Sequence, residues 1–315
     1  MFTKAERKKA KLRLALCGPS GSGKTYSALL IAQGLAPGGR IVLIDTENGS
    51  GELYSDMADY DIAALRPPYT PDRYIDLIRG AEKAGYDVLI VDSLSHAWAG
   101  EGGILDMHDK ATLASKTQNS FTAWREVTPQ HNALVETMLG SGLHLITTMR
   151  TKTAYDLVDD GAGKKKPVKI GLAPVQRDGL EYEFTAVLDL SVEGHIATAS
   201  KDRTRLLDGK HFVPSPATGE QLREWLETGK DAREESRLLL EELKGRVDEI
   251  DNIPHLNNWW RAHGAEIDRL IPADREALKD HCAFRKGAIL KAPLEERTDT
   301  GTKRKSKGNT QAAAA

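Results

Sequence analysis

The stretch with the clearest chemistry is GPSGSGKT at residues 18–25. It satisfies the pattern Gly-x-x-x-x-Gly-Lys-[Ser/Thr] and lies between an apolar run and a helix-forming segment, as a phosphate-binding loop requires. Its glycines let the backbone turn N–H groups toward phosphate oxygens, to which a helix N-terminus adds positive partial charge. The Lys24 ammonium is expected to reach the terminal phosphates and the Thr25 hydroxyl to hold Mg²⁺. The expected nucleotide contacts are Gly18, Pro19, Ser20, Gly21, Ser22, Gly23, Lys24, Thr25 and Tyr26.

Carboxylates at the ends of two other apolar runs could complete such a site. Asp92 ends the run VLIVD and is expected to hold Mg²⁺ through water. Asp45 and Glu47 follow the run RIVLI, at the carboxyl edge where open α/β sheets bind ligands. Glu47 lies beyond that strand, so we expect it to position or deprotonate the attacking water; a loop carboxylate without a catalytic role is the alternative. The guanine-reading sequence Asn-Lys-x-Asp does not occur, which favours ATP over GTP.

The elements that must position these residues alternate between strands and helices. Apolar runs at 12–17, 40–45, 86–93 and 143–149 predict buried strands, and helical patterns separate them. This alternation predicts an α/β fold with a mainly parallel central sheet and helices on both faces. After Arg150 the pattern changes to two extended arms around a Gly-rich, basic tip, followed by segments that predict antiparallel strands.

The chain is expected to contain three parts. Residues 1–229 form the predicted nucleotide-binding domain, residues 230–292 a helical C-terminal module and residues 293–315 a disordered basic tail. The formal net charge of −2 excludes a uniformly basic nucleic-acid binder but allows local basic patches. Cys17 and Cys282 show neither zinc nor disulfide spacing, and no apolar run has the length of a membrane helix. A cytoplasmic protein without a membrane partner is therefore expected.

The basic tip is a candidate contact for single-stranded DNA. Lysines clustered among flexible glycines suit backbone phosphates without base readout. Asp159 and Asp160 oppose this interpretation because they partly cancel the local field, so a solvated hairpin tip is the alternative. The candidate DNA contacts are Lys164, Lys165, Lys166 and Lys169.

The order of these stretches resembles the RecA-like P-loop NTPase core. The phosphate loop, IDTE, the aspartate of VLIVDS, TTMRTK and SKDR follow one another as in that core. The phrases PVQRDGLEYEF, SKDRTRL and ATGEQLREWL are similar to those of phage-encoded AAA-type ATPases, presumed factors of recombination and single-strand annealing. The resemblance covers about residues 10–229, and a phage origin would place the protein in the host cytoplasm.

The resemblance implies roles for residues at two strand ends. Glu47 matches the catalytic glutamate of the RecA-like core. Thr147 and Thr148 fall where that core senses the γ-phosphate with an Asn-Gln pair, and Arg150 follows them as a further candidate sensor. Solvated charge at a strand end is the alternative for Arg150.

The resemblance also implies a role for the SKDR stretch. Lys201 and Arg203 lie one residue apart, on one side of an extended strand. They match a Lys-x-Lys or Lys-x-Arg pair that, in RecA-like filaments and rings, reaches the γ-phosphate of the neighbouring subunit. The pair would then stabilise developing charge on another subunit's ATP. A pair of exposed strand-end charges is the alternative.

Together these features predict a Mg²⁺-dependent ATPase that self-assembles and acts on single-stranded DNA in phage recombination, annealing or repair. One alternative is an ATP-driven helicase or helicase loader in replication, and another is a nucleotide-dependent interaction switch with little hydrolysis. The expected cofactors are ATP and Mg²⁺. The expected partners are single-stranded DNA, further copies of the chain in a ring or filament, and a single-strand-binding or other replication or recombination protein at the C-terminal helices.

Overall fold

The structure is a computed structural model that describes residues 9–115, 119–159, 165–229 and 231–291. The chain divides into two compact units, Met1–Gly229 and Lys230–Ala315. The predicted basic tail, residues 293–315, lies outside the described residues. Within the described ranges, no helix combines the length and the apolar character that a membrane crossing needs.

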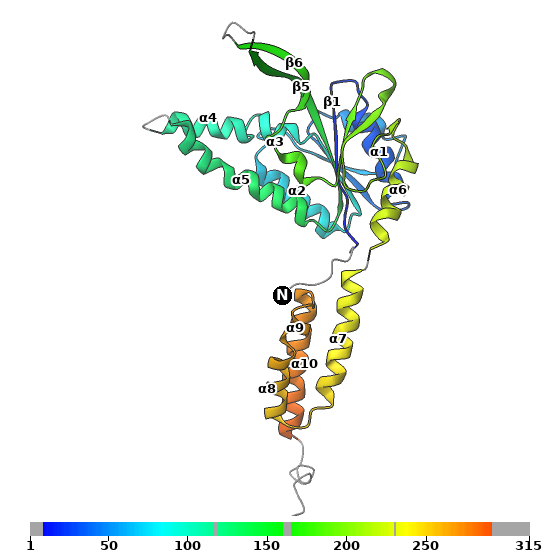
Figure 1. The fold of residues 1–315 in the computed structure, drawn as a ribbon, viewed down its shortest axis with the longest axis vertical. Helices are drawn as coiled ribbons and strands as arrows, with labels where there is room; N and C mark the ends of the chain where they lie inside the picture. Colours follow the sequence, from blue (N-terminus) through cyan, green and yellow to red (C-terminus); the bar gives the residue numbers. More distant parts are fainter. Residues whose placement is uncertain (1–8, 116–118, 160–164, 230, 292–315) are drawn as a thin grey trace, which may run out of the picture. The chain divides into compact units, whose positions relative to one another are not determined.

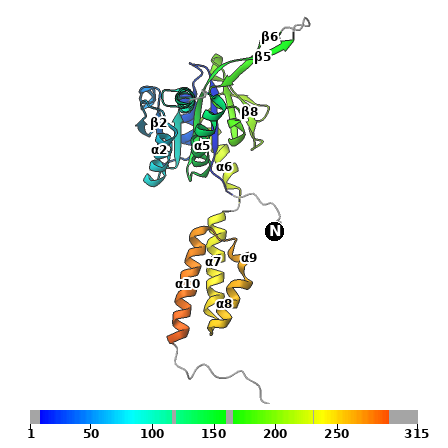
Figure 2. The same ribbon diagram turned by 90° about the vertical axis from the view of Figure 1, so that its left-hand side faces the viewer.

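A mixed nine-stranded sheet forms the centre of the first unit (Figures 1 and 2). Its order is β3-β2-β4-β5-β1-β7-β8-β9, and β6 lies off this path, paired with β5. The strands from β3 to β7 in this order pair in parallel, whereas β8 and β9 pair antiparallel with their neighbours. This topology confirms the predicted fold class. The strands are β1 (Arg13–Gly18), β2 (Ile41–Asp45), β3 (Asp61–Ala64), β4 (Val88–Asp92), β5 (His144–Asp159), β6 (Lys165–Pro174), β7 (Ala186–Leu190), β8 (Ala197–Asp202) and β9 (His211–Phe212).

Alternate side chains of the buried strands pack on opposite helical layers. Leu14 and Leu16 of β1 belong to a core shared with α1 and α6, whereas Ala15 and Cys17 belong to one shared with α2 and α5. Because helices cover both faces, the strands read as nearly continuous apolar runs. The helices of this unit are α1 (Lys24–Leu35), α2 (Pro71–Ala84), α3 (Ser95–Ala99), α4 (Ile104–Ala114), α5 (Ser120–Gly140) and α6 (Pro216–Glu227), with 3₁₀ turns η1 (Ser50–Tyr54), η2 (Leu180–Glu183) and η3 (Glu193–His195).

Two glycines let α1 and α6 cross at close range. A Cβ atom on Gly34 of α1 would overlap the Pro216 carbonyl, and one on Gly219 of α6 would overlap the Ile31 carbonyl. The close approach buries Leu222 of α6 completely against the sheet core. Since α1 begins at the phosphate-binding loop, this packing fixes the helix that the loop depends on.

Strand β5 forms part of the central sheet and part of a two-stranded arm. Its first residues, from His144 to Arg150, pair in parallel with β4 and β1 inside the sheet. Its later residues, from Thr151 to Asp159, pair antiparallel with β6. The two strands extend from the sheet as a two-stranded arm (Figure 1). A single continuous strand therefore connects the sheet interior to the arm.

The second unit is a small bundle of helices. Asp231 caps the first of them through hydrogen bonds from the Arg233 and Glu234 N–H groups. Leu240 is buried there, whereas its neighbour Leu239 is only partly buried. The helices are α7 (Ala232–Asp248), α8 (Ile253–Ala262), α9 (Gly264–Ile267) and α10 (Pro272–Lys291). One cluster of buried side chains consists of Leu240, Leu243, Ile267, Leu270 and Leu278, and Val247, Leu256 and Ile289 are also buried.

Candidate nucleotide-binding site

The phosphate-binding loop joins the end of β1 to the start of α1. Gly21 and Gly23 have φ angles of 80° and 81°, in the left-handed region that favours glycine. A Cβ atom on Gly18 would overlap the Ser22 side chain, which is fully buried. No side chain caps the N-terminus of α1 at Gly23, so the first N–H groups of the helix are available to an anion.

Lys24 and Thr25 lie on the first turn of α1. The Lys24 ammonium donates to the Pro19 carbonyl at 2.8 Å and therefore lies across the loop. Burial lowers the Lys24 pKa, while the Asp92 and Glu47 carboxylates oppose that shift. The Thr25 hydroxyl donates to an Asp92 carboxylate oxygen at 2.6 Å. The loop, the base of α1 and the end of β4 thus meet in one place.

The Asp92 carboxylate is enclosed by hydroxyl donors. Its side chain is 2% exposed, and its two oxygens accept hydrogen bonds from Thr25 and Thr148. Burial raises the Asp92 pKa, and the two hydroxyl hydrogen bonds oppose this rise. A divalent cation at this position would relieve the desolvation of the carboxylate.

The donors present fit Mg²⁺. Thr25 and Asp92 offer hard oxygen atoms, and Mg²⁺ is usually held by one or two such protein oxygens together with phosphates and water. Across the residues that the structure describes, no group of three or more His, Cys, Asp or Glu side chains could hold a metal ion. Mg²⁺ held by Thr25 and Asp92 would take its remaining ligands from nucleotide phosphates and water.

Glu47 is held by a cation and a hydroxyl. The Arg150 Nε atom and the Ser93 hydroxyl each donate to its Oε1 atom at 2.9 Å, and Arg150 Nη2 also donates to Oε2. Burial favours protonation of Glu47, but the hydrogen bonds from Arg150 and Ser93 prevail and lower its pKa. Asp45 has a different role, because its carboxylate accepts from the Glu47 and Gly49 N–H groups and shapes the loop after β2.

The phosphate-binding loop and the side chains of Glu47, Asp92 and Arg150 line one pocket of about 590 Å³. Two aromatic rings stand beside the phosphate loop: Tyr54 lines the pocket, and its ring packs edge-on against Tyr26 with centroids 6.1 Å apart. Tyr26 is 45% exposed, so the pair offers a surface on which a nucleobase could stack. The lining residues are Ser20, Gly21, Gly23, Lys24, Thr25, Glu47, Ser50, Tyr54, Asp92, Arg150 and Thr151.

The two candidate sensor threonines point to different partners. Thr148 contacts Asp92, whereas the Thr147 hydroxyl donates to the Leu14 carbonyl of β1 at 3.5 Å and is fully buried. Neither lines the pocket, but Thr148 contacts a residue that does. Arg150, the third candidate, lines the pocket itself through its contact with Glu47.

Lys201 and Arg203 are neighbours, as their spacing predicts, but they do not line this pocket. Lys201 is the next-to-last residue of β8, and its ammonium donates to the Glu181 and Tyr182 carbonyls at 2.8 and 2.6 Å. Arg203 donates to the same Tyr182 carbonyl at 2.8 Å. Burial and the Arg203 charge lower the Lys201 pKa.

The candidate DNA contacts lie on the arm. Lys165, Lys166 and Lys169 belong to β6, whose side chains the structure leaves undescribed at these positions. Lys164 lies outside the described residues.

Residues that the sequence interpretation did not single out also contribute to the pocket. They include Ser50, Tyr54 and Thr151. In the sequence, Tyr54 is marked only as an aromatic residue in the 3₁₀ turn that follows the Glu47 loop. This pattern points to the pocket only when the structure is known.

The comparison with protein families agrees with this geometry. Residues 10–215 match the sequence profile of the AAA domain. The chain belongs to the AAA domain family. Membership indicates a nucleotide-binding P-loop ATPase, typically dependent on Mg²⁺. No curated protein matches the chain.

The AAA domain provides the parts that ATP hydrolysis requires. Bound Mg²⁺ would neutralise charge on the phosphates. The loop N–H groups and Lys24 would bind and orient the phosphates, and Glu47, whose pKa the Arg150 hydrogen bonds help to lower, would be the group that accepts a proton from water. The Ser93 hydroxyl donates a second hydrogen bond to the Glu47 Oε1 atom, so the carboxylate has a defined orientation.

Replacing Arg150 with glutamine is expected to move the acidic limb of the kcat/KM profile for ATP hydrolysis to higher pH. Burial favours the protonated form of Glu47, and loss of the guanidinium removes the strongest opposing interaction, so the Glu47 pKa rises. Because only the ionised carboxylate accepts a proton, the variant should lose activity at a higher pH than the wild type as the pH falls. Initial rates measured from about pH 5 to 9 test this. Arg125→Gln, at an exposed position of α5, is the control; a profile that stays in place would contradict the expectation.

Proposed function

We propose that this AAA domain protein is a Mg²⁺-dependent ATPase that acts on single-stranded DNA, with ATP sites shared between subunits, in phage recombination, annealing or repair. The observation that carries the DNA part is the continuity of β5. One strand contains Thr148, which contacts Asp92, and Arg150, which holds Glu47, and then continues into the β5–β6 arm.

The arm has the charge that a DNA backbone requires. Its paired segments, residues 151–159 and 165–174, contain four lysines and two aspartates. In the strand register Asp159 lies opposite Lys165, so part of the charge is balanced, while Lys166 and Lys169 lie opposite Val158 and Tyr155. An excess of lysine on the arm suits contacts with backbone phosphates, which are independent of sequence.

The same strand offers a route from DNA to the catalytic glutamate. Arg150 lies one residue before the first pair of the arm, Thr151 with Pro174. A change in the arm's position on DNA would be transmitted to the Arg150 backbone and so to its ion pair with Glu47. The Arg150 backbone N–H group donates to the Ser95 hydroxyl at 2.9 Å, and this hydrogen bond holds the Arg150 backbone in place beside the site.

Shared sites are supported by the placement of Lys201 and Arg203. Both are held at the end of β8 by carbonyls of η2, away from the residues that line the pocket of the same chain. Cations fixed in this way are available to a second copy. The helices of the second unit remain the proposed contact for a single-strand-binding or other replication or recombination protein.

The decisive experiment is ATP hydrolysis at several protein concentrations with and without an oligo(dT) of about 40 nucleotides, a length that spans several binding-site sizes. DNA is expected to raise the rate, and more so at high protein concentration. Replacing Lys166 and Lys169 with glutamate should abolish this stimulation. The same double substitution should also make DNA binding less dependent on salt. The slope of the logarithm of the DNA association constant against the logarithm of the salt concentration should fall in magnitude by about 1.4, as expected for two lost phosphate contacts.

The control variant carries the same charge reversal at two lysines outside the arm, Lys210→Glu and Lys244→Glu. DNA should still stimulate ATP hydrolysis by this variant. Hydrolysis that ignores DNA and protein concentration would contradict the proposal and favour a nucleotide-dependent interaction switch. Strand separation with translocation would favour a helicase or helicase loader instead.

A further inference from the structure

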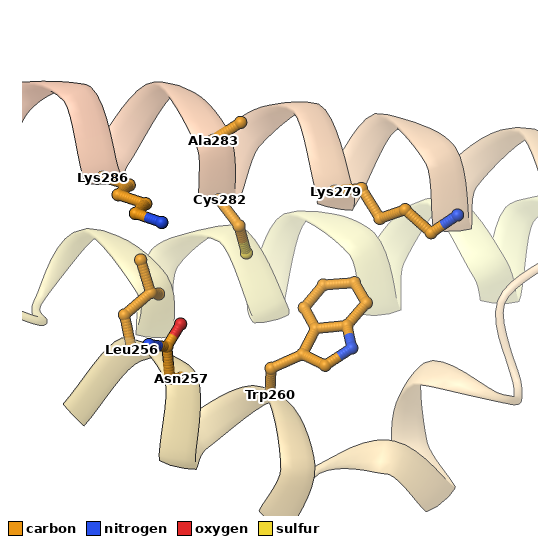
Figure 3. Close-up of a pocket in the computed structure, with 7 residues that line it drawn as sticks. All are labelled: Leu256, Asn257, Trp260, Lys279, Cys282, Ala283 and Lys286. Carbon is orange, nitrogen blue, oxygen red and sulfur yellow. The ribbon is translucent and has the colours of Figure 1, made fainter. Parts of the chain in front are cut away.

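A groove lies between α8 and α10 of the second unit, with a volume of about 310 Å³ (Figure 3). Its floor is largely apolar, because Leu256 is buried there and the Trp260 ring lies between the two helices, close to the Cys282 sulfur. The two lysines of the lining mark its two ends along α10. The lining residues are Leu256, Asn257, Trp260, Lys279, Cys282, Ala283 and Lys286.

The charged side chains that line the groove are both cations, Lys279 and Lys286. Helix α8, with the sequence IPHLNNWWRA, has no acidic residue, and the last ten residues of α10, CAFRKGAILK, contain three cations and no acid. Lys286 makes no ion pair within the part of the chain that the structure describes. Lys279 pairs with Glu276 at 2.7 Å, but both side chains are more than half exposed, so this pair is weak and can be exchanged for another carboxylate.

We propose that this groove binds an acidic peptide of a partner protein, in which an apolar side chain is flanked by two carboxylates. Lys279 and Lys286 are seven residues apart on one helix, which separates them by roughly 10 Å along its axis. An extended peptide rises about 3.3 Å per residue and its side chains alternate between two faces, so carboxylates four positions apart lie on one face together with the residue midway between them. They are separated by roughly 13 Å, and the flexible lysine side chains close the difference. The side chain between them enters the groove and packs against Trp260, Leu256 and Ala283.

Trp260 supplies a further element of recognition. Its indole N–H group makes no hydrogen bond within the described ranges, while its ring forms one wall of the groove. An aromatic ring with a free donor is typical of the anchor positions in protein interfaces, where it packs on an apolar side chain and donates to a peptide carbonyl. The groove therefore offers one apolar contact, one backbone contact and two charge contacts.

The shape of the groove favours a peptide over nucleic acid. Proteins that bind single strands without sequence preference stack successive bases on exposed aromatic rings. This groove has a single ring, Trp260, which is half-buried and closed from the other side by α10. The inference does not depend on the DNA substrate proposed above, because the groove belongs to the second unit alone.

The test is fluorescence anisotropy with the full chain and the fluorescein-labelled peptide Gly-Asp-Gly-Phe-Gly-Asp-Gly-Ser, in which both aspartates and the phenylalanine lie on one face when the peptide is extended. We expect saturable binding below about 0.5 mM, in the range of weak peptide motifs. Replacing both aspartates of the peptide with asparagine, or its phenylalanine with serine, should each weaken binding about tenfold or more. Labelled oligo(dT) of the same net charge serves as the nucleic-acid probe.

Variants of the chain locate the binding site. Lys279→Glu with Lys286→Glu should weaken peptide binding at least tenfold, and Ala283→Leu, which fills the groove, should do the same without a change of charge. The pair Lys210→Glu and Lys244→Glu carries the same change of charge elsewhere and should leave binding unchanged. Circular dichroism and thermal melting identify any variant that does not fold.

Three outcomes would overturn the inference. The first is no saturable binding of the acidic peptide, and the second is binding that the groove variants leave unaltered. The third is a preference for oligo(dT) that the groove variants remove, which would assign the groove to nucleic acid. ATP hydrolysis by the groove variants should equal that of the wild type, so failure here is distinguishable from failure of the proposed ATPase function.

Discussion

Replacing Glu47 with glutamine should lower the rate of ATP hydrolysis by about 10³-fold, the effect typical of losing a general base. The carboxylate lines the nucleotide pocket and is oriented by Ser93 and Arg150, and its lowered pKa keeps it ionised at neutral pH. Glutamine has nearly the same shape and can still accept a hydrogen bond, but it cannot take a proton. Steady-state phosphate release at saturating ATP measures the change.

ATP binding separates this effect from damage to the site. The loop, Lys24 and Thr25 are untouched by the substitution, so a fluorescent ATP analogue should bind the Glu47→Gln variant within about threefold of the wild type. Lys24→Ala provides the contrast, because it removes the cation that reaches the phosphates and should weaken binding itself. Asp45→Asn tests the neighbouring carboxylate, which shapes the loop after β2. Near-normal hydrolysis by Glu47→Gln would assign the proton acceptor to another group.

Those parts of the site that depend on a few adjacent residues could be predicted from the sequence. The phosphate loop is such a part, because its glycines, Lys24 and Thr25 are consecutive and the loop needs only a strand before it and a helix after it. The position of Asp92 at the end of a buried strand was also predictable, since it ends an apolar run, whereas its role in binding Mg²⁺ stays a prediction. The parallel sheet followed from the continuous apolar character of the runs. The observed topology confirms that fold class.

Contacts between distant segments could not be predicted in the same way. The ion pair between Glu47 and Arg150 joins residues 103 positions apart. It forms because β2, β4 and β5 are adjacent in the sheet, an order that apolar runs do not encode. The groove in the second unit has the same origin, because it exists only where α8 meets α10. The packing of the bundle also decides which of two adjacent leucines of α7 is buried, since Leu240 is buried and Leu239 is only partly buried.

Replacing both Lys201 and Arg203 with alanine should lower DNA-stimulated ATP hydrolysis by about 10³-fold, as expected when cations that stabilise a transferring phosphoryl group are lost. The two side chains share the Tyr182 carbonyl and do not line the pocket of their own chain. ATP binding by dilute, unassembled protein should stay within about threefold of the wild type, because the pair would act only on a neighbour's nucleotide. Lys210→Ala, on the loop after β8, is the matched control.

A mixing experiment then decides whether the pair acts on its own chain or on a neighbour. The Glu47→Gln variant and the Lys201→Ala, Arg203→Ala variant are each nearly inactive. In a mixed head-to-tail assembly, an intact Glu47 from the second variant meets intact cations from the first at about one interface in four, so about a quarter of the wild-type rate should return. If the cations served their own chain, no interface would be complete and the mixture would stay inactive. Because each variant alone supplies the baseline, restored hydrolysis has no explanation other than a site built from two copies.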